Sequence, residues 1–400
     1  MGTDKSIATP DALPGGTVFE KLDLPLFKPS IPGFEDLKPF YDEISGSGYQ
    51  SNFGPISRRF EDALAALLGV EYVLALSNLS TGIMYMPRAA GLTDGEVICP
   101  SFSFLATAHS MLLGGLTPVF ADVDRETLTL CPQSVEAAIT ENTVAVLGMH
   151  TYGNPCDIAA LEKICDRHGL VLLFDAAHGL GAKYQGRRLG SFGLAEGFST
   201  SATKIFSTLG EGGFIATDDA SFAENIRYMR NWGHLGDYNA RMPSIVSKLP
   251  ELSAAAGLLE LEKLEGYCNI RQELAAFAQQ QLGEIPGIRF PLVRPGDVCG
   301  FKDFTIIIDE DFPMTRDMLS QVLAACGVQS RKYFSPSIHQ TVAYEHMPVR
   351  VPLDNTIEAS AKVISLPMFN HLKLSEMERM CKLIADIAAN PAEAEALIGE

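Results

Sequence analysis

Short apolar runs alternate with helical patterns along the first half of the chain. The runs are continuous and predict strands at residues 72–76, 97–99, 117–120, 144–147 and 170–174. Between these runs the apolar positions recur with the spacing of a helix, as they do over residues 58–68 and 157–168. Continuous apolar strands separated by helices are typical of a parallel sheet that is covered on both faces. We therefore expect an α/β fold with a mostly parallel sheet.

The pattern changes near residue 265. Helices are predicted there at residues 258–267, 272–282, 316–326 and 375–388, and a strand at 304–308. This succession indicates a smaller C-terminal α/β domain, and a chain of 400 residues is long enough for two domains. Residues 1–33 are rich in Pro and Gly. We therefore predict an N-terminal arm at 1–33, a large domain at 34–265 and a small domain at 266–400.

The charge of the chain restricts its partners. The formal net charge is −18, from 49 acidic and 31 basic side chains. A surface this acidic repels nucleic acid and anionic membranes, so we expect neither as a partner. An anionic small molecule can still bind where local Arg, Lys or backbone N–H groups outweigh the overall field.

The cysteines and the N-terminal segment bear on metal binding and location. The eight cysteines form no Cys-x-x-Cys pair and have no zinc-ligand spacing, so we expect small buried side chains in a reducing compartment and no metal site. Residues 1–11 are polar and lack the apolar core of a signal peptide. Because no apolar run reaches the ~18 residues of a membrane span either, we expect a cytoplasmic protein.

Ligands of parallel sheets bind beyond the carboxyl ends of the strands, so the residues that follow each strand are candidates. Residues 77–82 carry hydroxyls at the start of a helix, which is typical of an anion site and equally of an ordinary N-cap. Phe104, after the second strand, could stack on a flat ligand or pack in the core. Asp175 follows a buried strand, so it either meets a cationic partner, such as a protonated pyridine nitrogen, or caps a helix.

Lys204 is the fourth candidate. It ends a segment of small and hydroxyl-bearing residues, 198–204, and the glycine-rich stretch 210–213 follows. The glycines permit a close backbone approach but do not form a P-loop, in which the lysine comes after the glycines. The pair Gly179 and Gly181 lacks the third glycine of a dinucleotide-binding motif. An anion cradle, a stacking ring, a buried acid and a lysine thus meet at one edge of the predicted sheet.

In this order the segments resemble the DegT/DnrJ/EryC1/StrS aminotransferases. The resemblance lies in residues 100–107, 174–179, 190–191, 198–204, 210–213, 230–233 and 331–336, and it covers roughly residues 25–390. It implies a fold-type-I enzyme that depends on pyridoxal 5′-phosphate (PLP). Such enzymes mostly transfer an amino group, with glutamate as the expected donor, to a nucleotide-linked keto sugar. Two departures are Leu79, where Gly is commoner, and Trp232, where His is frequent.

The resemblance also implies roles for single residues. Lys204 would carry PLP as a Schiff base, Asp175 would pair with the pyridinium nitrogen, and His178 would lie near the phenolic oxygen of the ring. Phe104 would stack on that ring. The phosphate would be held by Ser80, Thr81 and Ser199, and by Asn231 across the interface of a homodimer.

A basic and aromatic segment is the candidate substrate site. The adjacent pair Arg331 and Lys332 supplies positive charge for a diphosphate, Tyr333 could pack on a sugar or base, and His339 could donate a hydrogen bond. The same pattern is typical of a solvated basic pair beside buried aromatics.

Three other functions stay open at this point. The first is an aminotransferase of the same family that acts on a cyclitol or another carbocyclic ketone. The second is a PLP-dependent sugar dehydratase, against which Lys204 argues because the comparable dehydratases have His there. The third is a PLP-binding regulator without turnover, which the set of Lys204, Asp175 and His178 disfavours. The sequence does not identify the sugar or the carbon that is aminated.

Overall fold

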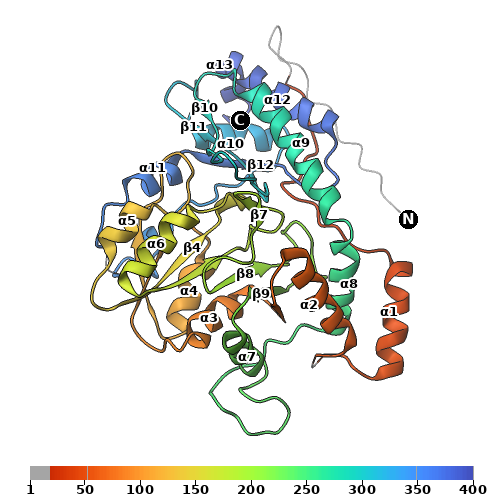
Figure 1. Cartoon of the computed structure of the whole chain (residues 1–400). Helices are drawn as coiled ribbons and strands as arrows, with labels where there is room; N and C mark the ends of the chain where they lie inside the picture. Colours follow the sequence, from red (N-terminus) through yellow and green to blue (C-terminus); the bar gives the residue numbers. More distant parts are fainter. Residues whose placement is uncertain (1–18, 52, 348, 400) are drawn as a thin grey trace.

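A seven-stranded sheet forms the centre of the computed structural model, which describes residues 19–51, 53–347 and 349–399 (Figure 1). The strand order is β1-β9-β8-β5-β4-β2-β3, and β9 runs antiparallel to both of its neighbours while the other pairs are parallel. The strands are β1 (Tyr72–Leu76), β2 (Glu96–Pro100), β3 (Thr117–Ala121), β4 (Thr143–Met149), β5 (Val171–Asp175), β8 (Ala195–Ser199) and β9 (Gly213–Thr217). The predicted α/β fold with a mostly parallel sheet is confirmed.

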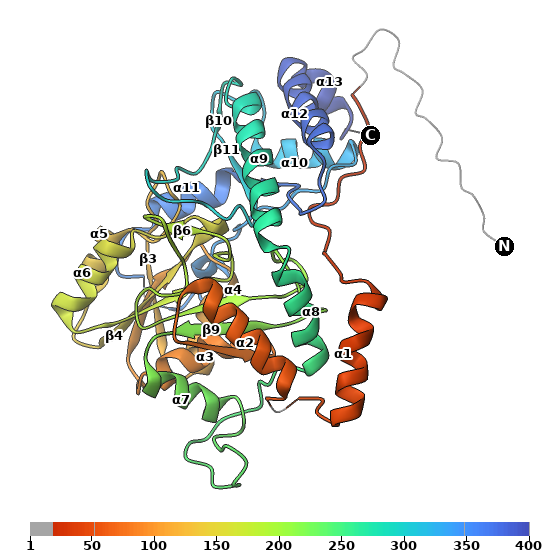
Figure 2. The same cartoon turned by 45° about the vertical axis from the view of Figure 1, so that its right-hand side comes forward.

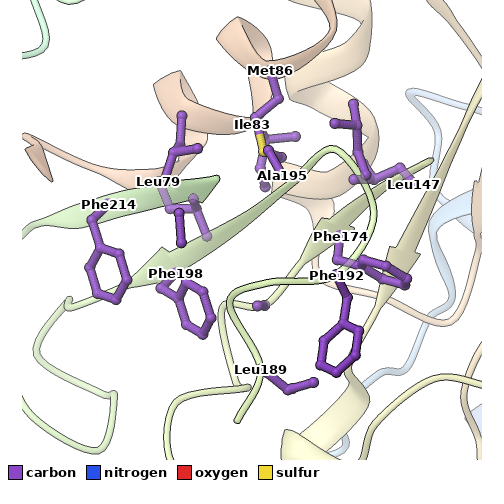
Figure 3. Close-up of a cluster of buried hydrophobic side chains, with 14 of the residues drawn as sticks. Leu79, Ile83, Met86, Leu147, Phe174, Leu189, Phe192, Ala195, Phe198 and Phe214 are labelled. Carbon is purple, nitrogen blue, oxygen red and sulfur yellow. The ribbon is translucent and has the colours of Figure 1, made fainter. Parts of the chain in front are cut away.

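Helices cover this sheet. They are α2 (Pro55–Leu68), α3 (Leu79–Ala89), α4 (Leu105–Leu113), α5 (Pro132–Ala138), α6 (Ile158–His168) and α7 (Ala220–Met229). Helix α8 (Glu251–Leu261) packs on α2, and α1 (Phe34–Ser47) packs on α8. Helix α3 packs against β1, β5, β8 and β9, and α2 packs against β1. In Figure 3 the side chains of Leu79, Ile83 and Met86 from α3 lie on one side of the strands, and the ring of Phe198 lies on the other.

Two glycines let α3 approach the strands closely. A Cβ atom on Gly197 in β8 would lie 2.7 Å from the Leu79 side chain, and one on Gly213 in β9 would lie 2.9 Å from the Leu79 backbone nitrogen. Real Cβ atoms essentially never come so near another heavy atom. The first turn of α3 can therefore rest against the carboxyl end of β8, which carries Ser199.

The C-terminal part contains a smaller antiparallel sheet, β10 (Ile288–Arg289), β11 (Phe304–Ile308) and β12 (Val363–Leu366). Its helices are α9 (Leu264–Leu282), α10 (Arg316–Ala325), α11 (Asp354–Lys362), α12 (Leu374–Ala389) and α13 (Pro391–Ala396). Helices α8 and α9 follow one another along one side of the molecule and join the two parts (Figure 2). A short hairpin, β6 (Lys183–Tyr184) with β7 (Arg187–Arg188), lies between β5 and β8 in the sequence, and one-turn 3-10 helices occur at Thr151–Gly153 and Ile338–Gln340.

Most predicted elements occur within a residue or two of their expected ends, but two predictions were wrong. The helices expected at 258–267 and 272–282 are instead α8, which ends at Leu261, and one unbroken α9. Residues 268–271 continue the helix, and Arg271 among them is buried and donates to the carbonyls of Phe301 and Lys302. Strands β8, β9, β10 and β12 were not predicted; β9 begins at Gly213, within a glycine-rich stretch that is typical of a loop. No helix of the described residues is long and apolar enough to cross a membrane.

The chain crosses between the two parts more than once. Phe19, Leu22 and Leu24 belong to the predicted N-terminal arm and pack into the core of the small sheet, while residues 1–18 of that arm lie outside the described residues. Ile338 and Tyr344, far along the sequence, pack into the core of the large sheet. The domain limits at 33 and 265 stay predictions.

Candidate active site

A cavity of about 340 Å³ opens at the carboxyl edge of the large sheet, within the range of about 300–1,000 Å³ that is usual for small-molecule sites. We call it the inner cavity. Its lining comes from residues after β1, β2, β4, β5 and β8, together with two segments of the C-terminal part. The lining residues are Asn78, Leu79, Ser80, Ile83, Phe104, Ala106, Met149, Asp175, Ala177, His178, Ser199, Ser201, Thr203, Lys204, Glu211, Lys302, Tyr333 and Phe334.

Lys204 lies in a turn five residues after the end of β8 and faces this cavity. Its backbone N–H donates to the Ser201 carbonyl at 3.0 Å, which fixes the turn. Burial, and then the positive charge of Lys302, lower the pKa of Lys204 to about 7. An amine that is neutral for much of the time at neutral pH is a competent nucleophile and base.

Asp175 is the last residue of β5 and is 3% exposed. Thr107 donates to its Oδ2 at 2.8 Å, and the backbone N–H of Ala177 donates to its Oδ1 at 3.1 Å. Burial raises the pKa of this carboxyl group despite both hydrogen bonds. A cationic partner inside the cavity would therefore be favoured, because it would stabilise the ionised carboxylate.

His178 lies three residues further on and is also buried. The backbone N–H of Tyr152 donates to its Nδ1 at 3.2 Å, so the neutral ring carries its proton on Nε2. Burial first, and then the charges of Lys204 and Lys302, lower the pKa of His178 well below its usual value. The ring is thus a neutral hydrogen-bond donor with a fixed tautomer.

An anion cradle occupies another wall of the cavity. Leu79 and Ser80 from the first turn of α3 line the cavity together with Ser199, so the N-terminus of a helix, whose first N–H groups lack helical partners, lies beside it. Asn78 caps the helix by accepting from the N–H of Thr81 at 2.9 Å. The hydroxyl of Thr81 does not line the cavity: it donates to the Asn78 carbonyl at 2.9 Å and contacts Ser247.

Phe104, at the N-cap of α4, lines the cavity and is 58% exposed. A large apolar side chain that is exposed on a cavity wall is suited to cover a flat ligand. Tyr333 and Phe334 face the cavity from the C-terminal part, and Phe334 stacks on His178 with ring centres 6.3 Å apart.

The four predicted substrate residues do not all line the same cavity. Arg331, Lys332 and Tyr333 line a second space of about 500 Å³, the outer cavity, which shares Phe104, Tyr333 and Phe334 with the inner one. His339 lines neither cavity, because its Nδ1 contacts the Ser101 hydroxyl at 2.6 Å and its ring is held there.

Asn231 also lies away from the inner cavity of this chain. Its side chain donates to the His234 carbonyl at 2.7 Å and accepts from Lys248 at 3.2 Å. These contacts hold it in the loop that follows α7.

Sequence reasoning missed several residues that line the inner cavity. Lys302 and Glu211 are charged, and Asn78, Ser201 and Thr203 are polar. Asn78 and Ser201 lie inside the candidate segments 77–82 and 198–204, so their position after a strand could have identified them as lining residues. Lys302 precedes a strand of the small sheet, and nothing in its local sequence points to the large one.

The described residues fit PLP. The amine of Lys204, whose pKa is lowered, could react with the aldehyde group of PLP. Among the described residues, the buried carboxylate of Asp175 has no cation in hydrogen-bond contact and could pair with the ring nitrogen. The N-terminus of α3 could bind the phosphate. Lys204, Asp175, His178, Phe104, Ser80 and Ser199 are the residues that would hold the cofactor.

Fold and site together define a PLP-dependent aminotransferase of fold type I. Residues 35–385 match the family described as the DegT/DnrJ/EryC1/StrS aminotransferase family. The chain belongs to this family, a family of PLP-dependent aminotransferases, and the transaminase predicted from the sequence is thereby confirmed.

Three relatives illustrate the similarity. The chain is 34% identical over 92% of its length to all of the dTDP-4-amino-4,6-dideoxy-D-glucose transaminase of Shigella dysenteriae. It is 30% identical over 90% of its length to 98% of the GDP-perosamine synthase of Vibrio cholerae. Among solved structures, that of DesI in the presence of its TDP-sugar product superimposes with a TM-score of 0.89, at 36% identity, over 96% of this chain and 97% of DesI.

The lowered pKa of Lys204 predicts a pH dependence. Protonation blocks nucleophilic attack, so the rate at which apoprotein captures added PLP should rise with pH up to about 7 and level off above it. An ordinary lysine would keep gaining reactivity up to a pH of about 10.4. Stopped-flow absorbance between pH 6 and 9 measures this profile. A capture rate that still climbs at pH 9 would contradict the assignment.

Proposed function

We propose that the protein transfers an amino group from an amino acid, with glutamate as the expected donor, to the keto group of a nucleotide-linked deoxysugar. The names of the relatives support a sugar of this kind: two are named for nucleotide-linked amino sugars, and DesI was crystallised with a TDP-sugar product. The carbocyclic ketone is the second candidate that the sequence left open, but no contact in the described residues favours it.

One observation carries this proposal, namely that the inner and outer cavities adjoin. Phe104, Tyr333 and Phe334 line both of them. The inner cavity holds Lys204, and the outer one holds the cations Arg331 and Lys332. A ligand with a ketone at one end and a diphosphate at the other matches this arrangement, because its charge then lies where the acidic protein presents basic groups.

The residues of the inner cavity divide the chemistry between them. PLP, when bound, supplies a ring that accepts electrons from the carbon that loses its proton. Asp175 would hold the proton on the ring nitrogen, and His178 would supply a hydrogen bond from Nε2. The Nζ atom of Lys204 would take a proton from the α-carbon of the donor as a base and, as an acid, deliver it to the cofactor.

The direct test is amino transfer by the purified protein. We expect glutamate with PLP to aminate dTDP-4-keto-6-deoxyglucose or the corresponding GDP-linked 4-keto sugar, with the product detected by mass spectrometry. An inosose ketone serves as the carbocyclic comparison. Amination of the inosose alone would overturn the sugar proposal in favour of the second candidate.

A substitution in the outer cavity should change the kinetics of the sugar substrate and leave those of glutamate unchanged. Lys332 is paired with Asp317 at 2.7 Å, whereas the Arg331 guanidinium contacts a backbone carbonyl, so Arg331 has more donors left for a diphosphate. Arg331→Met should raise the KM for the sugar about tenfold or more and leave the KM for glutamate unchanged. His339→Gln, outside both cavities, is the matched control and should alter neither constant.

We also propose a homodimer in which Asn231 reaches the phosphate site of the partner. The exposed Trp232 and Tyr238 in the same loop support a contact there, because large exposed apolar side chains gather at interfaces. Light scattering should give twice the mass of the chain. A monomer with full activity would exclude this role for Asn231.

A further inference from the structure

Lys302 has no role in the function proposed so far. It immediately precedes Asp303 and β11 in the C-terminal part, yet its side chain lines the inner cavity together with Lys204. It is 7% exposed, which is rare for a lysine unless the charge has a purpose or a partner. Lys204 and Lys302 are the two lysines among the described residues that line this cavity.

The position of Lys302 is fixed by its surroundings. Its backbone N–H donates to the Tyr152 carbonyl at 2.9 Å, and its own carbonyl accepts from the guanidinium of Arg271 at 3.2 Å. Its ammonium lies 2.7 Å from Asp303 Oδ1 and 5.5 Å from the centre of the Tyr333 ring. A cation held in this way loses little conformational entropy when it binds a ligand.

The ammonium of Lys302 retains hydrogen-bonding capacity. A lysine has three N–H donors, and within the described part of the chain Asp303 is its one hydrogen-bond acceptor. Two donors therefore remain in a buried, preorganised cation that faces a cavity. In such a place a hydrogen bond to an anion is stronger than it would be at the surface.

We propose that Lys302 binds the α-carboxylate of the amino-acid donor and thereby selects α-amino acids for the reaction. This inference rests on the proposed function for the existence of such a donor. The α-carboxylate is bonded to the same carbon that loses its proton to Lys204, so it must lie in the inner cavity. The diphosphate of a nucleotide sugar lies across the sugar ring from the ketone, nearer to Arg331 and Lys332. The ammonium of Lys302 is therefore better placed to bind the α-carboxylate of the donor than the diphosphate of the sugar substrate.

The test changes the ligand and the protein in parallel. Glutamate is compared with its 1-amide, which lacks the α-carboxylate, in the donor half-reaction, followed by cofactor absorbance without any sugar. The protein is changed by Lys302→Met with Asp303→Asn, so that no unpaired charge stays buried. In the unchanged protein we expect the amide to react about 10- to 100-fold less efficiently. In the double variant the two donors should differ by less than about threefold.

Binding and the second half-reaction complete the test. Calorimetry with 2-oxoglutarate, which does not react with the PLP form, should show a loss of affinity in the double variant of about tenfold or more. The KM for the sugar should not change. Arg331→Met is the matched control, because it removes a cation from the outer cavity and should keep the preference for glutamate over the amide.

Each outcome decides the proposal. Discrimination against the amide that persists in the double variant overturns it, and so does a weakened sugar half-reaction with an intact donor half-reaction. If the double variant does not fold, Lys302→Gln is measured with the same two donors and must lose the discrimination. Because the donor half-reaction needs no sugar, its result can be interpreted even if the proposed sugar substrate is wrong. Failure of every amino acid to react would refute the proposed function instead.

Discussion

Alanine in place of Lys204 is expected to lower amino transfer by at least about 10⁴-fold. The change removes the amine that would both bind the cofactor covalently and move the proton of the donor. The turn around residue 204 is held by the backbone contact to Ser201, so the fold should survive. Steady-state rates with glutamate and the accepted sugar measure the loss.

Chemical labelling identifies the residue independently of the rate. Borohydride reduction of the PLP-loaded protein should fix the cofactor on the peptide that contains Lys204, as read by mass spectrometry. Lys163→Ala, at an exposed position of α6, is the control and should retain full activity and labelling. Label on any other lysine would refute the assignment.

Changing Asp175 to Asn should lower the rate on the order of 10³-fold while the protein stays folded and still binds PLP. Asn has nearly the same shape and can keep contacts with Thr107 and the Ala177 N–H, but it cannot stabilise a positive charge on the ring nitrogen. Because burial raises the pKa of Asp175, the ionised carboxylate is costly in the apoprotein and its loss should not destabilise the fold.

Two measurements separate these effects. Thermal unfolding of the apo variant should occur at or above the temperature found for the unchanged apoprotein, and the absorbance of the bound cofactor should shift because its nitrogen is no longer protonated. Asp166→Asn, at an exposed position of α6, should change neither property. Near-normal turnover by Asp175→Asn would disprove the role.

The strand pattern of the sequence located most of the inner cavity. Residues 77–82 follow the run 72–76 and Asp175 follows the run 170–174, and parallel strands deliver whatever follows them to one edge of the sheet. That rule depends only on local hydrophobicity, which is why it succeeded. Thr81 shows its limit, because spacing alone could not tell that its hydroxyl turns toward Asn78 and Ser247 rather than toward the cavity.

Contacts between distant segments could not be predicted in this way. Lys302 reaches the cavity because Tyr152 and Arg271, 150 and 31 residues away, hold its backbone. His339 leaves the substrate site because Ser101 binds it. Both positions are set by tertiary contacts between residues far apart in sequence. The hydrophobic pattern of one segment does not show which distant segment will pack against it.

The common wall of Phe104, Tyr333 and Phe334 has a consequence for engineering. The residues proposed to perform the chemistry line the inner cavity on one side of it, and the basic pair that would meet a nucleotide lines the outer cavity on the other. The segment 330–332 can therefore be diversified in a library to change which nucleotide is accepted, while turnover is preserved. Changes in the wall itself would alter both properties at once, so a library that spares these three rings should yield far more active clones.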